Sequence, residues 1–134
     1  MDEIYLYLQT HFGITYKDWE IIASKMYIEK FKKKAIILQP GGQEEHLSFL
    51  SKGVLRFFIP TEENKETDIT YDFMFEKKFA CADESFITRT PSIYGIEALT
   101  DVLLYRFTYN DLQDIYKKLN LRSVLVESLI KTFF

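Results

Sequence analysis

Apolar residues recur at helical spacing through the first 26 residues of the chain. Before Gly13 ends the pattern, one helical face is formed by residues four positions apart, Ile4, Leu8 and Phe12. Thr15 then stands three residues before Asp18, the spacing of a capping box with aspartate in place of the usual glutamate. The pattern predicts two N-terminal helices within residues 1–26, the second with a buried stripe of Trp19, Ile22, Ala23 and Met26.

From residue 27 the apolar period changes to two, which indicates β-strands. Alternating or β-branched runs follow one another: "YIEKFKKK", "AIIL", "HLSFLSKGVLRFFIP", "DITYDFMF" and "SIYGIEALTDVLLYRFTY". Turn residues separate them at Pro40-Gly41-Gly42, at Lys52-Gly53, in residues 61–67 and in residues 99–101. Many short strands with such turns predict a mainly β sandwich or barrel over residues 27–109.

One segment interrupts this succession of strands. Residues 79–92, "FACADESFITRTPS", are mostly small or polar and carry two acids, Asp83 and Glu84, and one arginine, Arg89. This composition suits neither a buried strand nor a long helix, so we expect a polar loop.

Helical patterns return in residues 110–134. Asn110 or Asp111 can cap "LQDIYKKL". The segment "LRSVLVESLIKTFF" follows, with Leu121, Leu125 and Leu129 on one helical face and Val126, Ile130 and Phe134 on another. A helix that is apolar on two faces needs two partners. The β structure is one, and a second subunit is expected as the other; burial of both faces within one chain is the alternative.

Composition places the chain among globular proteins. Its 134 residues are enough for a single domain with its own core, and 47% of them are apolar. The net charge of −3 gives no electrostatic footprint for nucleic acid. The single cysteine, Cys81, excludes an internal disulfide, and the N-terminus is acidic where a signal peptide would be basic. No apolar run approaches the roughly 18 residues of a membrane span. We therefore expect a cytoplasmic protein with no membrane partner.

Candidate catalytic chemistry is sparse. The two histidines, His11 and His46, and Cys81 are far apart in sequence and do not make a plausible metal set. No nucleophile elbow and no phosphate-binding P-loop motif is present. The short basic runs "FKKK" and Lys77-Lys78 are expected at solvated strand edges. The sequence therefore predicts no enzymatic activity.

The order of these elements resembles the cyclic-nucleotide-binding effector domain of Crp/Fnr transcriptional regulators. The most similar segments are "LSFLSKGVLRFFIP" (residues 47–60) and "IEALTD" (residues 96–101), which lie at the expected separation. The resemblance extends from about residue 17 to the end of the chain. It implies a double-stranded β-helix, or jelly roll, flanked by N-terminal and C-terminal helices. It also implies a homodimer that pairs through a C-terminal helix, here Leu121, Leu125, Val126, Leu129 and Ile130.

In nucleotide-binding members, the segment equivalent to residues 79–92 is a phosphate-binding cassette, roughly Phe-x-Gly-Glu-Leu-x-x-Phe followed by Arg-Ser/Thr-Ala. Phe79 and Phe86 match its aromatic residues. Cys81 stands in place of the glycine, Ala82 in place of the ribose-binding glutamate and Ser92 in place of the phosphate-binding arginine. Each lost charge-assisted contact costs on the order of 1.5–3 kcal/mol, so the usual recognition of cyclic AMP is not expected. The candidate ligand residues of this segment are Cys81, Ala82, Asp83, Glu84, Ser85, Arg89, Thr90 and Ser92.

We interpret the chain as the ligand-sensing and dimerisation domain of a Crp/Fnr-like regulator whose cassette is retuned to another small-molecule effector. No cofactor beyond that effector is implied. Such regulators continue into a helix-turn-helix domain that binds DNA, and this sequence stops inside the long helix, which favours a fragment over a stand-alone sensor. One alternative is a ligand-free structural or protein-interaction module, in which the cassette segment merely closes the roll. A cupin-like enzyme with a bound metal is the other.

Overall fold

The structure, a computed structural model, describes residues 2–61 and 68–118. Two helices, α1 (Asp2–Phe12) and α2 (Tyr16–Lys25), come first. A short helix, α3 (Asp83–Thr88), interrupts the strands, and α4 (Tyr109–Lys118) follows them. The strands are β1 (Tyr27–Phe31), β2 (Ile36–Leu38), β3 (His46–Lys52), β4 (Leu55–Pro60), β5 (Asp68–Met74), β6 (Lys78–Ala80), β7 (Gly95–Ala98) and β8 (Val102–Thr108).

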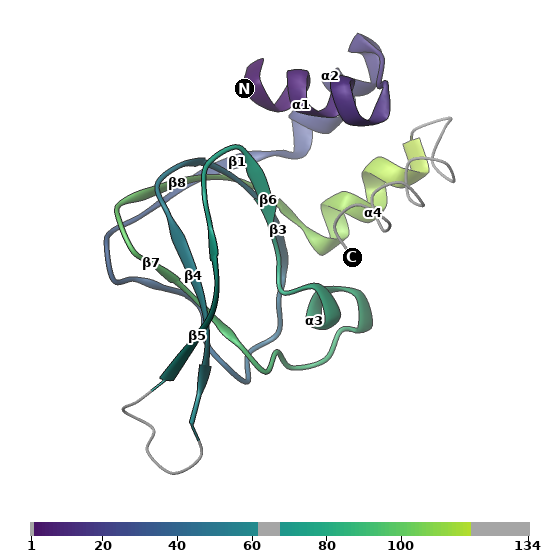
Figure 1. Cartoon of the computed structure of the whole chain (residues 1–134). Coiled ribbons are helices and arrows are strands. Elements are labelled where there is room, and N and C mark those ends of the chain that lie inside the picture. The colour runs from purple at the N-terminus through teal and green to yellow at the C-terminus, as the bar shows by residue number, and fades with distance from the viewer. Residues whose placement is uncertain (1, 62–67, 119–134) are drawn as a thin grey trace.

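The strands form two antiparallel four-stranded sheets, with the orders β1-β8-β3-β6 and β2-β7-β4-β5. Figure 1 shows the two sheets facing each other, with the hairpin of β4 and β5 extending at one end of the roll. The sheets stay separate and no closed barrel forms among the described strands. The predicted mainly β jelly roll with flanking helices is confirmed.

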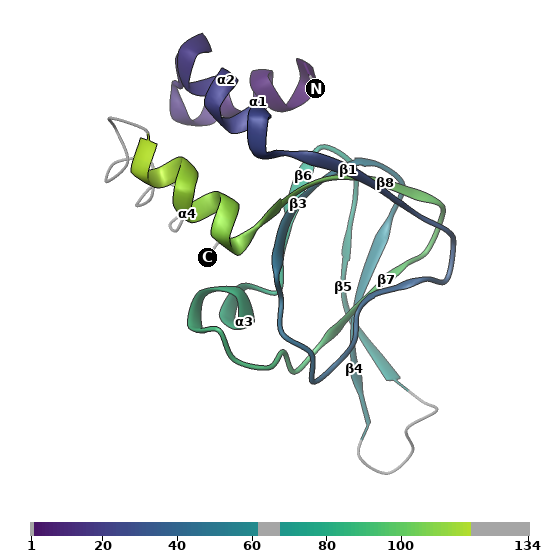
Figure 2. The same ribbon diagram turned by 180° about the vertical axis from the view of Figure 1, so that it is seen from behind.

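The N-terminal helices and α4 gather at the other end of the roll (Figure 2). The predicted capping box is present: Thr15 Oγ1 accepts the N–H of Asp18 at 3.1 Å, and Asp18 Oδ2 accepts the N–H of Thr15 at 3.2 Å. The cap predicted for α4 was wrong. Thr108 Oγ1 accepts the N–H of Asp111 at 3.0 Å, so the capping side chain belongs to the end of β8 rather than to Asn110 or Asp111.

The core has two parts. One joins the helices to the first sheet and includes Ile4, Trp19, Phe49, Phe86 and Phe107. The other fills the space between the two sheets and includes Leu50, Leu55, Ala98, Val102 and Leu104. Because α3 contributes Phe86 to the first part, the cassette segment is anchored in the core.

The expectation of a polar loop over residues 79–92 was wrong for residues 79–88, whereas residues 89–92 belong to no helix or strand. Phe79 and Ala80 belong to β6, and the small residues Cys81 and Ala82 are buried. Their small side chains let the backbone pass close to the core, which a solvated loop would not do. A helix of six residues, α3, then follows.

The residues predicted to form the dimerisation helix, Leu121, Leu125, Val126, Leu129 and Ile130, lie outside the described residues. The predicted loop at residues 61–67 does so too, apart from residue 61. No helix in residues 2–61 or 68–118 is long and apolar enough to cross a membrane.

Candidate ligand pocket

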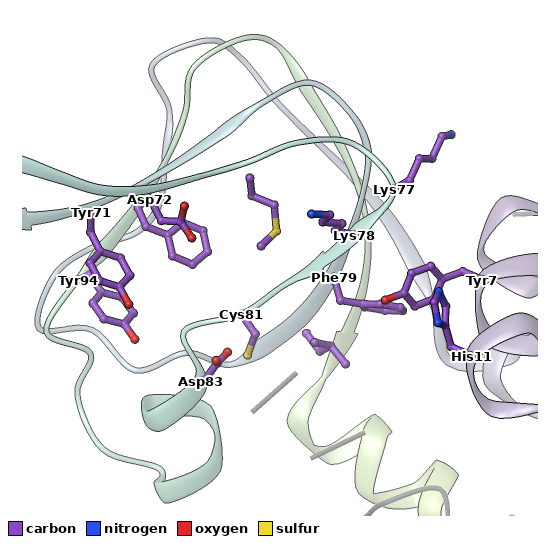
Figure 3. A pocket seen from close by; sticks show the side chains of 13 residues that line it. Tyr7, His11, Tyr71, Asp72, Lys77, Lys78, Phe79, Cys81, Asp83 and Tyr94 are labelled. Atoms are coloured by element: carbon purple, nitrogen blue, oxygen red, sulfur yellow. The ribbon is translucent and has the colours of Figure 1, made fainter. Parts of the chain in front are cut away.

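A pocket of about 490 Å³ opens between the roll, α1 and α3. Its size is that of a small-molecule site. Figure 3 shows the side chains that surround it. They come from α1, β3 to β6, the start of α3 and the segment before β7: Tyr7, His11, Leu47, Phe57, Tyr71, Asp72, Met74, Lys77, Lys78, Phe79, Cys81, Asp83 and Tyr94.

Aromatic rings form one wall of this pocket. Tyr71 and Tyr94 are stacked, with ring centroids 5.5 Å apart and planes 7° from parallel, and Phe57 lies 6.2 Å from Tyr94. Tyr71 is 61% exposed, so much of its side chain is accessible to a ligand. At the opposite end of the pocket in Figure 3 lie Tyr7 and His11. Such walls suit a flat, largely apolar ligand.

A bulge explains how two neighbouring residues of β5 both reach the pocket. Adjacent side chains of a regular strand point to opposite faces. The pairing of β4 with β5 shifts between Phe57 and Phe58, which pair with Asp72 and Thr70, so Tyr71 is an extra residue on its strand. The bulge re-aims the local side chains, and Tyr71 and Asp72 both line the pocket as a result.

Four charged side chains stand around the pocket. Lys77 forms an ion pair with Glu3 of α1 and points away from the cavity in Figure 3. Asp72 and Lys78 are exposed at the rim. Asp83 is half-buried at the start of α3, and this desolvation raises its pKa from 3.8 to about 6.

Glu44 fixes the cassette segment to the start of β3. Its Oε2 accepts the N–H of Ala82 at 3.0 Å and its Oε1 accepts the N–H of His46 at 3.2 Å. Its own N–H donates to Ser85 Oγ at 2.8 Å. Burial raises the pKa of Glu44, while the two N–H donors act in the opposite direction. The backbone N–H before α3 is therefore already bound to a carboxylate of the protein.

Arg89 forms contacts within the protein and does not line the pocket. Its guanidinium donates to the backbone oxygen of Glu44 at 3.1 Å, pairs with Glu45 at 2.9 Å and lies 3.9 Å from the ring centroid of Tyr109. Its backbone caps α3 in the left-handed conformation, with φ of 60°. These contacts direct the side chain toward α4.

The other arginines in the described residues also have protein partners. Arg56 pairs with Asp68 at 2.6 Å and with Glu97 at 2.8 Å. Arg106 is buried, donates to Ser48 Oγ at 2.9 Å and pairs with Glu29 at 2.6 Å. No arginine among residues 2–61 and 68–118 lines the pocket.

Of the residues predicted to bind a ligand, the structure places two on the pocket, Cys81 and Asp83. Ala82 and Ser85 are buried, and both form hydrogen bonds with Glu44. Four line a separate hollow of about 70 Å³: Glu84, Ser85, Thr90 and Ser92. Ser92 is buried there and bonds to the backbone of Tyr94.

Sequence reasoning missed most of the pocket. The aromatic residues Phe57, Tyr71 and Tyr94 were assigned to strands without a role, and Lys78 was expected at a solvated edge. Alternation in "DITYDFMF" could have grouped Tyr71 with Phe73, but nothing in the sequence marked the bulge that brings Asp72 beside Tyr71. Among the described residues, no group of three or more His, Cys, Asp or Glu side chains could hold a metal ion.

Comparison with known proteins agrees with the fold described above. A family model described as a cyclic nucleotide-binding domain matches residues 28–118. No curated protein matches the sequence. Among solved structures, the chain is similar to the Thermus thermophilus catabolite activator protein, with a TM-score of 0.74 and 14% identity, covering 90% of this chain and 55% of that one.

Two further structures have the same fold. The sensor domain of the transcriptional regulator DNR from Pseudomonas aeruginosa gives a TM-score of 0.74 at 15% identity, covering 93% of this chain and 84% of that one. The c-di-GMP responsive global regulator CLP from Xanthomonas campestris gives 0.71 at 13% identity, covering 88% of this chain and 56% of that one. The chain thus spans little more than half the length of the Thermus and Xanthomonas proteins.

Proposed function

The chain belongs to the family of cyclic nucleotide-binding domains, and from this we propose that it is the ligand-sensing and dimerising domain of a Crp/Fnr-like transcriptional regulator. In this proposal a small effector binds in the pocket, and the DNA-binding part of the regulator is a separate domain. The domain itself is cytoplasmic and catalyses no reaction.

The observation that carries this proposal is the pocket of about 490 Å³ whose wall includes the cassette segment. Cys81 and Asp83 belong to that segment, and Phe57, Tyr71 and Tyr94 come from the second sheet and the turn before β7. A ligand there would contact both α3 and the sheet, so its binding energy could shift α3 relative to the roll. A ligand changes a conformational equilibrium when it contacts the two states differently.

The proposed effector is not a cyclic nucleotide bound in the usual way. A cyclic phosphate needs a guanidinium and free N–H donors at the start of the cassette helix. Arg56, Arg89 and Arg106 are engaged by protein partners, and the N–H of Ala82 is engaged by Glu44. The similarity to a regulator described as c-di-GMP responsive supports a fold that accepts different effectors.

Dimerisation is proposed from the sequence of the C-terminal segment. This segment has two apolar stripes, which need two partners. One stripe is Leu121, Leu125 and Leu129, and the other is Val126 and Ile130. One stripe would pack on this subunit and the other on its two-fold mate.

The experiment is a screen of small molecules by thermal shift, followed by calorimetry of the hits and of cyclic AMP. We expect at least one class of small molecule to stabilise the domain, because a ligand that binds the native state raises the melting temperature. We expect cyclic AMP to bind in the high-micromolar range or more weakly. Low-micromolar binding of cyclic AMP would contradict the proposed effector, and a screen without any hit would favour a ligand-free structural module.

A further inference from the structure

The four charged side chains that line the pocket cancel formally, two carboxylates against two lysines, but a further carboxylate pairs with one of the lysines. Asp72 and Asp83 both line it, and neither forms an ion pair within the described part of the chain. Of the two lysines at the pocket, Lys77 is held by Glu3 of α1. With Glu3 counted beside Lys77, the described charges at the pocket sum to −1, and Lys78 is the pocket lysine without an ion pair among the described residues.

Asp83 is the carboxylate with the most to gain from a cationic partner. It is half-buried, and burial without a positive neighbour disfavours its charged form, which is why its pKa rises to about 6. Near neutral pH the group is mostly ionised and still lacks a cation. A ligand that brought a positive charge to Asp83 would offset this desolvation.

The neighbouring wall selects a flat ring. Tyr71 and Tyr94 stack on each other, and the ring of Phe57 lies 6.2 Å from that of Tyr94. Tyrosine and phenylalanine faces attract both aromatic rings and organic cations. In Figure 3 this stack and Asp83 lie on the same side of the pocket, away from Tyr7 and His11.

We propose that the pocket binds a small aromatic molecule that carries a protonated amine, with the ring against Tyr71 and the amine at Asp83. This inference rests on the proposed sensor function and names the class of effector. Asp72 adds a second negative charge at the rim. Lys78 can bind one acceptor group of the same ligand, such as a hydroxyl or a carboxylate.

An anionic ligand fits the pocket less well. A phosphate or an isolated carboxylate would add negative charge beside Asp72 and Asp83, with Lys78 as its one unpaired lysine partner among the pocket residues. Like charges at short range in a partly desolvated site repel each other. We therefore expect the pocket to bind amines more tightly than anions.

The experiment uses three probes with one ring and different charges: tyramine, 4-ethylphenol and 4-hydroxyphenylacetate. Dissociation constants are measured by calorimetry or ligand-observed NMR with the 134-residue protein at neutral pH. We expect tyramine to bind roughly tenfold more tightly than 4-ethylphenol, the ratio of one charge-assisted contact in a partly exposed site. We expect 4-hydroxyphenylacetate to bind most weakly.

Two carboxylates in the first turn of α3 provide a matched pair of variants. Asp83→Asn should bring the affinity of tyramine close to that of 4-ethylphenol. Glu84→Gln removes the same charge from the adjacent position, which does not line the pocket, and should leave the preference for tyramine intact. Tyr94→Leu should weaken all three probes together, and melting curves of each variant confirm that it is folded.

The outcomes separate this inference from the proposed function. Equal or tighter binding of 4-hydroxyphenylacetate relative to tyramine would overturn the inference and leave a sensor for another ligand class. An amine preference that survives Asp83→Asn would also overturn it. If none of the probes binds while another compound of the thermal-shift screen does, the inference is wrong and the sensor function stands.

Discussion

Glu44 Oε2 accepts the backbone N–H of Ala82 at 3.0 Å, so a buried carboxylate just before β3 holds the residue that precedes α3. Ala82 is the position at which the resembled family has its ribose-binding glutamate. In this chain a carboxylate is present near that position, but it comes from 38 residues earlier and is directed at the protein. The contact positions α3 without any ligand.

Glu44→Ala should therefore destabilise the domain. The variant leaves the N–H groups of Ala82 and His46 without their acceptor, and each buried unpaired donor costs about 1–3 kcal/mol. We expect a total loss of about 2–4 kcal/mol, measured by urea unfolding. Glu45→Ala, which removes an exposed partner of Arg89, is the control and should cost about 1 kcal/mol or less. Equal losses in the two variants would show that the buried contacts contribute little.

The titration of Asp83 should appear in the dependence of stability on pH. Because its pKa is raised from 3.8 to about 6, the native state binds the proton more tightly than the unfolded chain does. The stability that Asp83 contributes through this tighter proton binding is fully present below about pH 4 and is lost as pH rises through about 6. Without ligand, Asp83→Asn should stabilise the domain by about 1 kcal/mol near pH 7.5, a value reduced for the group's contact with solvent.

The same variant should differ little from the wild type near pH 4, where the wild-type carboxyl is protonated. Asp72, Lys78 and Cys81 border the same pocket as Asp83. Glu84→Gln removes a charge from the same turn of α3, so its stability is measured in parallel to correct for general effects of charge on that helix. A stabilisation by Asp83→Asn that is independent of pH would mean that desolvation of the carboxylate is not its cause.

Arg89 offers a test that separates backbone strain from side-chain contacts. Its φ of 60° is a conformation that glycine adopts freely and other residues adopt at a cost. Arg89→Ala and Arg89→Gly both lose the contacts with Glu45 and Tyr109, so both should be less stable than the wild type. The glycine variant should be more stable than the alanine variant by roughly 1 kcal/mol in thermal or urea unfolding. Both should still bind tyramine, and loss of binding in folded variants would instead assign Arg89 to the site.

The proposed dimer is tested in the segment beyond the described residues. An unpaired charge in an apolar seam is costly, so whichever of Leu125→Glu and Val126→Glu falls in the seam should convert the protein to a monomer. The other variant should affect the fold instead. Light scattering over a concentration series measures the assembly, and circular dichroism monitors folding. A wild-type chain that stays monomeric at hundreds of micromolar would contradict the proposal.

Several features were readable from the sequence because they depend on residues close together in the chain. The capping box needs Thr15 and Asp18, three residues apart. The turn at Lys52-Gly53 needs a residue without a Cβ: Gly53 has φ of +104°, and a Cβ there would lie 2.5 Å from the backbone oxygen of Asp101. Short apolar runs separated by turn residues were likewise sufficient for a mainly β sandwich or barrel, and the resemblance in element order specified the roll.

The candidate site depended on contacts that local patterns do not encode. The acceptor for the N–H of Ala82 is Glu44, and in the sequence this residue is one of two adjacent glutamates in the polar stretch "GGQEEH". Arg89 looked available for a ligand until the fold placed Glu45 and Tyr109 beside it. Tyr71 reached the pocket through a bulge set by its pairing with β4. Interactions between residues close together in the sequence thus determined most of the helices and strands and their order. Pairing between distant strands decided which side chains meet, because burial and charge compensation are fixed only when those strands come together.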